Sequence, residues 1–175
     1  MRILTATAFA LAMAATPAFA QDTDKAFDGP YVAVVGGAEE AGNPSTGNTG
    51  AFAGGVIGYD HQSGNLVLGI EGEATLSTTE RCVAGICNNA GRDLYAGGRV
   101  GYVVGGNTMI YAKGGYTNGR LALPMGTQTL DGWRAGGGVE TNITGSTFVR
   151  AEYRYSGYAA DAHKHQGTVG VGVRF

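Results

Sequence analysis

Few residues of this sequence have the types and spacing that catalysis requires. Its three histidines are His61, His163 and His165, and the last two lie near Ser156 and Asp161 in the chain. A catalytic nucleophile needs a base within hydrogen-bonding distance, and only this second group offers both kinds of side chain. We interpret all three histidines as solvated side chains of turns and loops, and we predict that the protein is not an enzyme.

Two cysteines, Cys82 and Cys87, are the other candidates for chemistry. No histidine and no second cysteine pair lies near them in the sequence, which argues against a metal site. The glycines do not form a phosphate-binding loop that ends in GK[ST], so the sequence also predicts no cofactor. In an exported chain, two closely spaced cysteines indicate a disulfide formed in the oxidising periplasm.

The N-terminus has the features of an export signal. Arg2 precedes an apolar run at 3–15, and Ala18 and Ala20 supply the small residues of a cleavage site. The apolar run is shorter than the ~20 residues that a membrane-spanning helix needs, so we expect cleavage. The predicted organisation is a cleaved signal peptide at 1–20, a short periplasmic N-terminal segment at 21–28 and a single domain at 29–175.

Charge and composition exclude two classes of protein. Without residues 1–20 the chain has 11 basic and 14 acidic residues, a net charge of −3. A nucleic-acid-binding domain carries clustered Lys and Arg and a high pI, so we predict no nucleic-acid partner. The 32 glycines disfavour a helical protein, because each glycine in a helix costs ~1 kcal/mol relative to alanine. We therefore expect an all-β chain.

Eight segments have the composition and alternation typical of β-strands. Short and long joins alternate between them, as in outer-membrane barrels with short periplasmic turns and longer external loops. The predicted fold is an eight-stranded antiparallel up-and-down transmembrane β-barrel. The expected strands are 29–37, 49–60, 66–76, 92–104, 108–117, 130–143, 147–158 and 165–175. The expected turns are 61–65, 105–107 and 144–146, and the expected external loops are 38–48, 77–91, 118–129 and 159–164.

Each predicted strand carries its charged residues on one face only. Near the C-terminus, Val149 and Ala151 alternate with Arg150 and Glu152, and period-two alternation sends the two sets to opposite sides of a sheet. The apolar face includes Ala and Gly, which suit contact with lipid better than a packed core. We therefore predict that the charged face points into the barrel. It comprises Glu71, Glu73, Arg99, Lys113, Arg134, Glu140, Arg150, Glu152, Arg154 and Arg174.

Aromatic residues support the same orientation. The last predicted strand ends in Phe175, which follows an apolar face formed by Val169, Val171 and Val173. Other aromatic residues lie toward strand ends, where membrane proteins have interfacial girdles. The residues expected in these girdles are Tyr59, Tyr102, Trp133, Tyr155 and Tyr158.

The predicted interior has four acidic and six basic side chains. An eight-stranded barrel is only wide enough inside for its own side chains. Because an unpaired buried charge costs several kcal/mol, we expect these groups to pair with one another and with trapped water. They would then form a plug that holds the strands together; a selective ion path is the alternative.

Several motifs carry a resemblance to a known family. They are GPYV at 29–32, RDLYAGGRVGY at 92–102, IYAKGGYT at 110–117, GWRAGGGVE at 132–140 and VRAEYRY at 149–155. The chain resembles the small eight-stranded outer-membrane barrels related to the OmpA transmembrane domain and OmpX, and more closely the opacity-type, porin-like surface antigens of alphaproteobacteria. The resemblance implies insertion by the outer-membrane assembly machinery, with Phe175 as the assembly signal, and it implies no catalytic residues.

These observations predict an integral outer-membrane protein of a Gram-negative cell, with a structural or surface-interaction role carried by the external loops. The expected partners are outer-membrane lipid and lipopolysaccharide, the assembly machinery during biogenesis, and a host or envelope protein that the loops bind. Two alternatives remain open. One is a narrow porin-like channel for small solutes; the other, less favoured, is a barrel enzyme that modifies lipid A.

Overall fold

The computed structural model describes residues 25–43, 46–77, 81–83, 86–88, 91–123, 126–158 and 163–175. Within these ranges, the side chains at 41–43, 46–48, 81–83, 86–88, 120–123 and 126–129 are not described. The predicted signal peptide at 1–20 lies outside the described residues.

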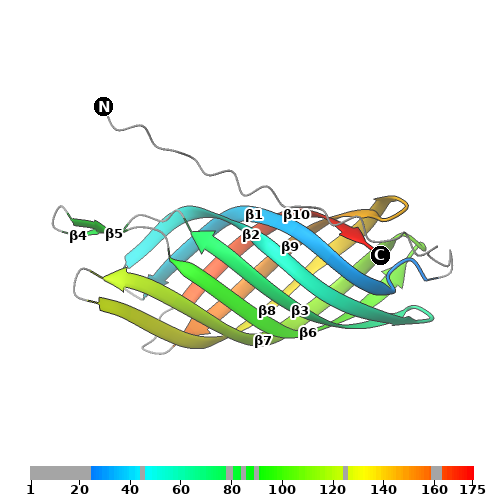
Figure 1. Ribbon diagram of the computed structural model, residues 1–175, viewed down its shortest axis with the longest axis horizontal. Helices are drawn as coiled ribbons and strands as arrows, with labels where there is room; N and C mark the ends of the chain where they lie inside the picture. The colour runs from blue at the N-terminus through cyan, green and yellow to red at the C-terminus, as the bar shows by residue number, and fades with distance from the viewer. Residues whose placement is uncertain are drawn as a thin grey trace.

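Eight strands form a closed antiparallel barrel, in which β1 pairs with β10 to close the sheet (Figure 1). This arrangement confirms the predicted eight-stranded fold. The strands are β1 (Gly29–Asn43), β2 (Thr46–Ser63), β3 (Leu66–Ser77), β6 (Arg92–Val104), β7 (Thr108–Leu123), β8 (Gly126–Thr144), β9 (Thr147–Tyr158) and β10 (His163–Arg174). Two short strands, β4 (Arg81–Val83) and β5 (Ile86–Asn88), form a separate hairpin between β3 and β6.

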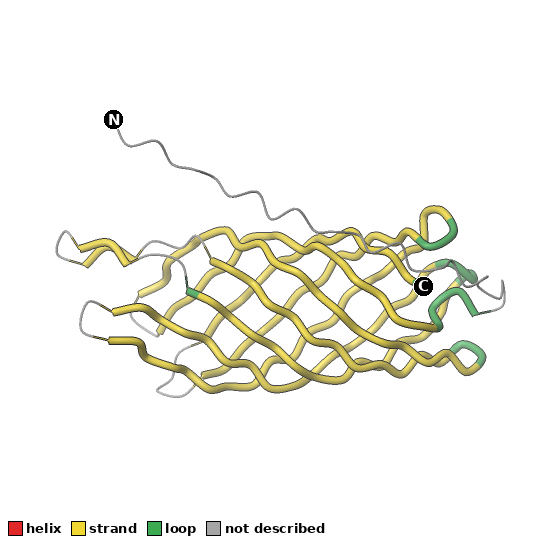
Figure 2. The backbone as a smooth tube through the Cα atoms, in the orientation of Figure 1, coloured by secondary structure: helices red, strands yellow, loops and turns green. Residues whose placement is uncertain are grey.

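Short turns join the strands at the end of the barrel where the C-terminus lies (Figure 2). Gly64, Gly105 and Gly145 have φ values of 59°, 68° and 44° in these turns. This left-handed conformation is the one that tight hairpin turns require and that glycine adopts without strain. All three residues lie within the turns predicted at 61–65, 105–107 and 144–146. The β4–β5 hairpin projects from the opposite end of the barrel (Figure 1).

Two hairpins at that opposite end contain longer strands than the sequence predicts. Loops are expected at 38–48 and 118–129, but β1 stays paired with β2 up to Asn43 and Thr46. Likewise, β7 stays paired with β8 up to Leu123 and Gly126. The Gly, Asn and Thr residues that suggested loops do not prevent pairing, because the ladder is made by backbone groups that every non-proline residue carries.

The other two expected loops also contain strand residues. The loop predicted at 77–91 includes the β4–β5 hairpin, and the loop predicted at 159–164 ends early because β10 begins at His163. His163 and His165 therefore lie in a strand that pairs with β1 and β9. The interpretation of His163 and His165 as loop histidines is wrong, although the strand predicted at 165–175 already included His165. His61, expected in the turn at 61–65, also lies in a strand, because β2 continues to Ser63.

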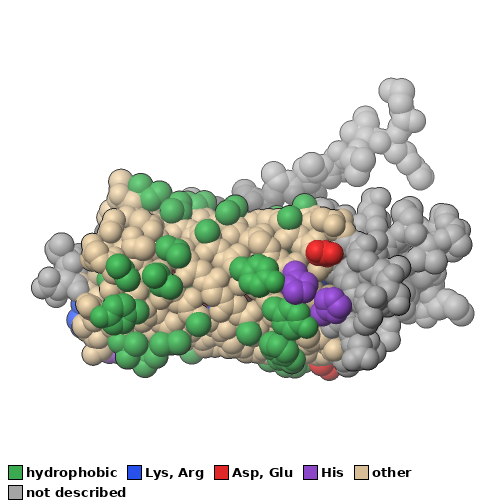
Figure 3. Space-filling view, turned by 180° about the vertical axis from the view of Figure 1, so that it is seen from behind, with side chains coloured by type: hydrophobic (Ala, Val, Ile, Leu, Met, Phe, Trp, Pro, Cys, Tyr) green, Lys and Arg blue, Asp and Glu red, His purple; other side chains and the backbone are tan. Residues whose placement is uncertain are grey.

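The barrel wall separates apolar from charged side chains. Ile70 is 68% exposed and Val169 is 65% exposed, whereas Arg134 is 1% exposed and Glu140 is fully buried. Figure 3 shows hydrophobic side chains spread over the outer wall. This pattern inverts that of a water-soluble protein and is the pattern of barrels that face lipid. No helix in the described part of the chain has the length and apolarity needed to cross a membrane.

Apolar side chains fill the barrel near its short-turn end. Of the periplasmic N-terminal segment predicted at 21–28, the structure describes residues 25–28, and Phe27 is fully buried inside the barrel. Its backbone N–H donates a hydrogen bond of 2.8 Å to the side chain of Gln62. Phe27 packs in one cluster with Val67, Val103, Met109 and Tyr111. Phe27 therefore fills the barrel at this end together with residues of the wall.

Candidate functional site

The candidate site is a network of ion pairs inside the barrel. The structure places all ten predicted interior charges there, each at most 5% exposed. They come from strands β3, β6, β7, β8, β9 and β10, which surround the interior. The alternation of each strand positions them, because every second side chain points inward.

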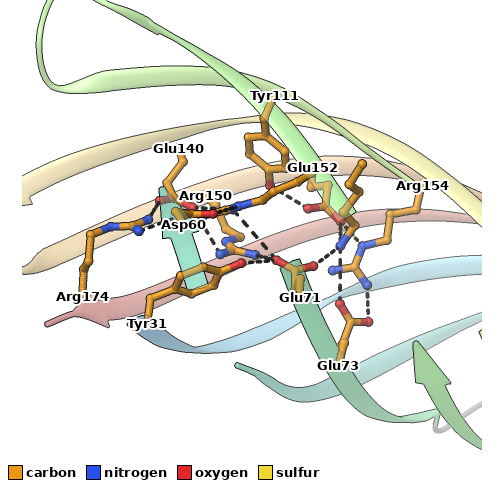
Figure 4. A network of polar contacts seen from close by, with 12 residues as sticks. Tyr31, Asp60, Glu71, Glu73, Tyr111, Glu140, Arg150, Glu152, Arg154 and Arg174 are labelled. Atoms are coloured by element: carbon orange, nitrogen blue, oxygen red, sulfur yellow. Dashed lines mark hydrogen bonds and ion pairs between the residues drawn. The ribbon is translucent and has the colours of Figure 1, made fainter. Parts of the chain in front are cut away.

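Glu71 of β3 is a highly connected carboxylate near the middle of the network (Figure 4). Its Oε1 accepts a hydrogen bond of 2.6 Å from Lys113 Nζ. Its Oε2 accepts one of 2.8 Å from Arg150 Nη1 and another of 2.8 Å from the hydroxyl of Tyr31. Because β3 and β9 lie on opposite sides of the barrel, the pair between Glu71 and Arg150 spans the interior.

A second group of pairs lies toward the short-turn end. Arg174 Nη1 is 2.7 Å from Asp60 Oδ2, and its Nη2 is 2.6 Å from Glu140 Oε1. Arg99 also contacts both carboxylates: its Nε donates to Asp60 over 2.8 Å and its Nη1 to Glu140 over 3.1 Å. Two guanidinium groups thus share two carboxylates, so each charge has at least two partners of opposite sign.

A third group lies toward the opposite end, from which the long hairpins extend. Glu73 Oε1 is 2.5 Å from Arg154 Nη1 and 3.2 Å from Arg134 Nη1. Arg134 extends the chain of contacts to Asp93, with 2.9 Å between Nη2 and Oδ2. Lys164 reaches the same oxygen of Asp93 over 3.2 Å. The network therefore runs along the barrel axis from one end to the other.

An aromatic side chain separates the arginines near the short-turn end. Tyr31 is fully buried, and its ring lies 4.4 Å from the guanidinium carbon of Arg99 and 4.9 Å from that of Arg174. An aromatic face attracts a cation at such distances. Tyr31 therefore fills space between like charges and interacts favourably with both.

Sequence reasoning missed four charged residues of the network. The structure adds Glu39, Asp60 and Asp93 to the four predicted acids and Lys164 to the six predicted bases, which gives seven of each sign. Glu39 and Lys164 fall in predicted loops, and Asp60 is the last residue of a predicted strand. Asp93 lies on the same face of β6 as Arg99, six residues away along the strand. Period-two alternation continued to the start of the strand would have predicted that it points inward.

One predicted girdle residue faces the other way. Tyr158 has the same alternation as Arg154 and Ser156 on β9, and its hydroxyl donates a hydrogen bond of 2.8 Å to Asp93 inside the barrel. Its placement in the girdle is therefore wrong. Tyr59, Tyr102 and Trp133 are about half exposed on the outer wall, at 49%, 57% and 55%.

The other predicted site residues lie apart from the network. Phe175 is at the seam between β1 and β10, where its backbone N–H donates to the carbonyl oxygen of Pro30 over 2.9 Å.

Cys82 and Cys87 are backbone partners across the β4–β5 hairpin, but their side chains are not described, so the disulfide stays a prediction. Among the described residues, no group of three or more His, Cys, Asp or Glu side chains is arranged to hold a metal ion.

Comparison with known proteins identifies the family. Residues 6–175 match the family model of the outer membrane protein beta-barrel domain, and the chain belongs to this family. It is 30% identical over 136 residues to the 25 kDa outer-membrane immunogenic protein of Brucella ovis, across 75% of this chain and 65% of that protein. It is 28% identical over 145 residues to the 22 kDa outer membrane protein of Rhizobium leguminosarum bv. viciae, across 73% of this chain and 68% of that protein.

Solved structures share the fold at low sequence identity. Neisserial surface protein A superposes with a TM-score of 0.64 at 17% identity, across 85% of this chain and 98% of that one. Ail, the attachment invasion locus protein of Yersinia pestis, gives a TM-score of 0.64 at 15% identity, across 85% and 99%. The protein is thus an outer-membrane β-barrel, as its resemblance to the small barrel families predicts.

Proposed function

We propose that this protein is a closed, non-conducting barrel that anchors external hairpins, through which it contacts a host or envelope protein. The observation that carries the proposal is the set of ion pairs between opposite walls. Arg150 and Glu71 approach to 2.8 Å, and Arg154 and Glu73 to 2.5 Å, each pair linking β9 to β3. Paired side chains that meet across the interior occupy the space that a conducting path would need.

The external hairpins support the second half of the proposal. The β1–β2 and β7–β8 hairpins stay paired up to the two residues at each tip. They therefore present regular β-structure at the end of the barrel opposite the short turns. Binding residues commonly lie on connections that a rigid scaffold positions. The Brucella relatives are named as immunogenic outer-membrane proteins and the structural neighbour Ail as an attachment protein, which agrees with exposure at the cell surface.

Conductance in planar lipid bilayers tests the closed interior. Purified, folded protein should insert and give no stable openings, since the network leaves its charges paired across the lumen. Reproducible single-channel steps from folded protein would contradict this proposal and favour the narrow porin-like channel. A general porin measured under the same conditions controls for insertion.

Attachment assays test the role of the hairpins. Cells that express the protein should adhere to cultured host cells, or resist detergent, better than cells without it. Replacing 81–88 by a short Gly-Ser linker should reduce one of these effects while the barrel still shows heat-modifiable migration on a gel. If replacements in all four external connections leave both effects unchanged, the surface-interaction role is refuted.

We also propose that the protein is not an enzyme. His61 lies near the short turns, where its Nδ1 is 3.2 Å from Asp28 Oδ1, whereas His163 and His165 lie in β10 at the external end. Lipid A from cells with and without the protein should have identical acyl chains by mass spectrometry. Gain or loss of an acyl chain would revive the alternative of a lipid A-modifying barrel.

Export and the loop disulfide are part of the same proposal. The mature chain should begin at Gln21, after removal of 1–20. Direct opposition of Cys82 and Cys87 across an antiparallel pair supports the disulfide, because such partners have Cα atoms about 4.5–5.5 Å apart, within the range that a disulfide spans. Intact mass spectrometry without reduction should give the mass from Gln21 onward less two hydrogens. Two cysteines that alkylate without reduction would contradict the disulfide.

A further inference from the structure

Two histidines lie next to each other on the outer wall of the barrel. His163 and His165 are two positions apart on β10, so their side chains leave the same face of the sheet. Their ring centroids are 5.7 Å apart and the rings are inclined by 80°. Figure 3 shows a pair of histidine side chains on this wall, beside a carboxylate and close to the external rim. The charge network inside the barrel does not use either residue.

Neighbouring tyrosines hold both imidazoles in place. The hydroxyl of Tyr153 lies 2.6 Å from Nδ1 of His165. The ring of Tyr155 stacks on His163 at 6.5 Å and 14°, and meets His165 edge-on at 5.0 Å. When one imidazole nitrogen is held by a hydrogen bond, the other is directed outward as a ligand, which is the arrangement found around metal-binding histidines.

The spacing of the two rings fits one shared ion. With metal–nitrogen bonds of about 2.0–2.1 Å, two imidazoles on the same ion have centroids about 5 Å apart. The observed 5.7 Å therefore requires only a small rotation of the side chains.

The local charges favour a cation. Glu40 is exposed and pairs directly with His165 across β1 and β10, and directly opposed side chains have Cβ atoms about 4.5–5.5 Å apart. Lys164, which lies between the histidines in sequence, points to the other side of the wall. Its Nζ is 3.2 Å from Asp93 and 3.5 Å from Glu39. The nearest positive charge in the sequence is therefore neutralised inside the barrel.

We propose that His163 and His165 form a two-imidazole site for a divalent transition-metal ion on the outer wall. Both residues are partly exposed and lie close to the rim of the wall (Figure 3), where water completes the coordination, so the ion is exchangeable and open to further ligands. Imidazole suits both Cu²⁺ and Zn²⁺, and the general order of affinities places Cu²⁺ first. The site would give the cell surface a weak metal-binding function that is independent of any loop partner.

Cu²⁺ titration of the full mature chain, folded in detergent micelles without an affinity tag, tests the proposal. The electron paramagnetic resonance spectrum should show two imidazole nitrogens on one equivalent of Cu²⁺. His163→Gln and His165→Gln should each remove one nitrogen and weaken binding at least about tenfold. His61→Gln, at the opposite end of the barrel, is the matched control and should leave the spectrum unchanged.

Heat-modifiable migration establishes that each variant is folded before its metal binding is compared. Equal Cu²⁺ binding by the wild type and by the folded double variant H163Q/H165Q would overturn the proposal, because the ion would then be held by other groups such as the N-terminal amine. A wild-type spectrum with fewer than two imidazole nitrogens would overturn it as well.

Discussion

Glu71 is one of the residues that join several buried groups of the interior network. Its carboxylate accepts hydrogen bonds from Lys113, Arg150 and Tyr31, so its loss affects three buried groups at once. Removing one partner of a buried ion pair is more damaging than replacing the whole pair, since the remaining charges stay buried without compensation. The network is therefore sensitive to single substitutions at its most connected members.

The substitution Glu71→Gln tests this sensitivity. It keeps the shape of the side chain but removes the charge that faces Lys113 and Arg150. We expect the free energy of unfolding to fall by about 3–5 kcal/mol, measured by urea unfolding in detergent micelles. Asp131→Asn is the control, because Asp131 is an exposed carboxylate that also accepts hydrogen bonds, from Tyr116 and Asn118; it should have no measurable effect. Equal midpoints for both variants would show that the interior pairs do not stabilise the barrel.

Phe27 makes the N-terminal segment part of the folded barrel. Its side chain is fully buried against Val67 and Met109, so Phe27→Ala leaves a cavity at the short-turn end. We expect this variant to lose about 3–5 kcal/mol of stability, as is typical of buried Phe→Ala changes, in the same unfolding assay. Phe27→Leu keeps an apolar side chain and should lose much less. If Phe27→Ala unfolds like the wild type, the segment is not anchored by this side chain.

At the scale of the strands, glycine has two different roles in the wall. A Cβ atom on Gly172 of β10 would lie 2.3 Å from Cζ of Phe148 and 2.5 Å from the carbonyl oxygen of Val32. A Cβ atom on Gly114 of β7 would lie no closer than 3.7 Å to its nearest neighbour, the carbonyl oxygen of Arg134. The first glycine makes room for an interior aromatic side chain, whereas a methyl group on the second would lie on the outer face of the wall at ordinary van der Waals distance from its neighbours.

Alanine substitutions separate these roles. Gly172→Ala should destabilise the barrel by about 1–3 kcal/mol, because the added methyl overpacks a filled interior. Gly114→Ala should be neutral or stabilise by up to about 1 kcal/mol, because glycine loses more conformational freedom than alanine when it enters a strand. Urea midpoints in micelles provide the comparison. A reversed order of the two variants would mean that the interior is not packed around Phe148 as described.

At the scale of the whole molecule, the segregation of connections defines the orientation in the membrane. Short turns at Gly64, Gly105 and Gly145 share one end with the C-terminus, and the long hairpins extend from the other (Figure 2). Outer-membrane barrels place short turns in the periplasm and longer connections outside the cell. The balanced interior charges fit either orientation of the barrel in the membrane. The orientation is therefore inferred from the lengths of the connections.

Epitope tags check the orientation. A tag inserted between Leu123 and Gly126 should bind antibody on intact cells, whereas a tag at Gly64 should bind only after the outer membrane is permeabilised. Both tagged proteins should still show heat-modifiable migration, which controls for folding. Antibody binding to the Gly64 tag on intact cells would place the short turns outside and refute the assignment.

Period-two alternation is a local property, and it accounts for what could be predicted from the sequence. The side chains of Arg150, Glu152 and Arg154 leave the same face of any regular strand, whatever their partners are. The extent of the strands was less predictable, because the pairing of β1 with β2 beyond Ala38 depends on backbone groups that all residues share. Glu39 was missed for that reason, and so were His163 and Lys164 as members of β10.

The sequence by itself therefore determined the eight strands of the barrel, ten of its inward-facing charges and the lipid-facing wall, since each follows from local geometry and the avoidance of charge in hydrocarbon. Only the tertiary structure decided which charges meet. Asp60 reaches Arg99 and Arg174, which are 39 and 114 residues away in the chain. Such pairs depend on the tilt and stagger of the strands, which set the height of every side chain along the barrel axis and are not properties of any single strand.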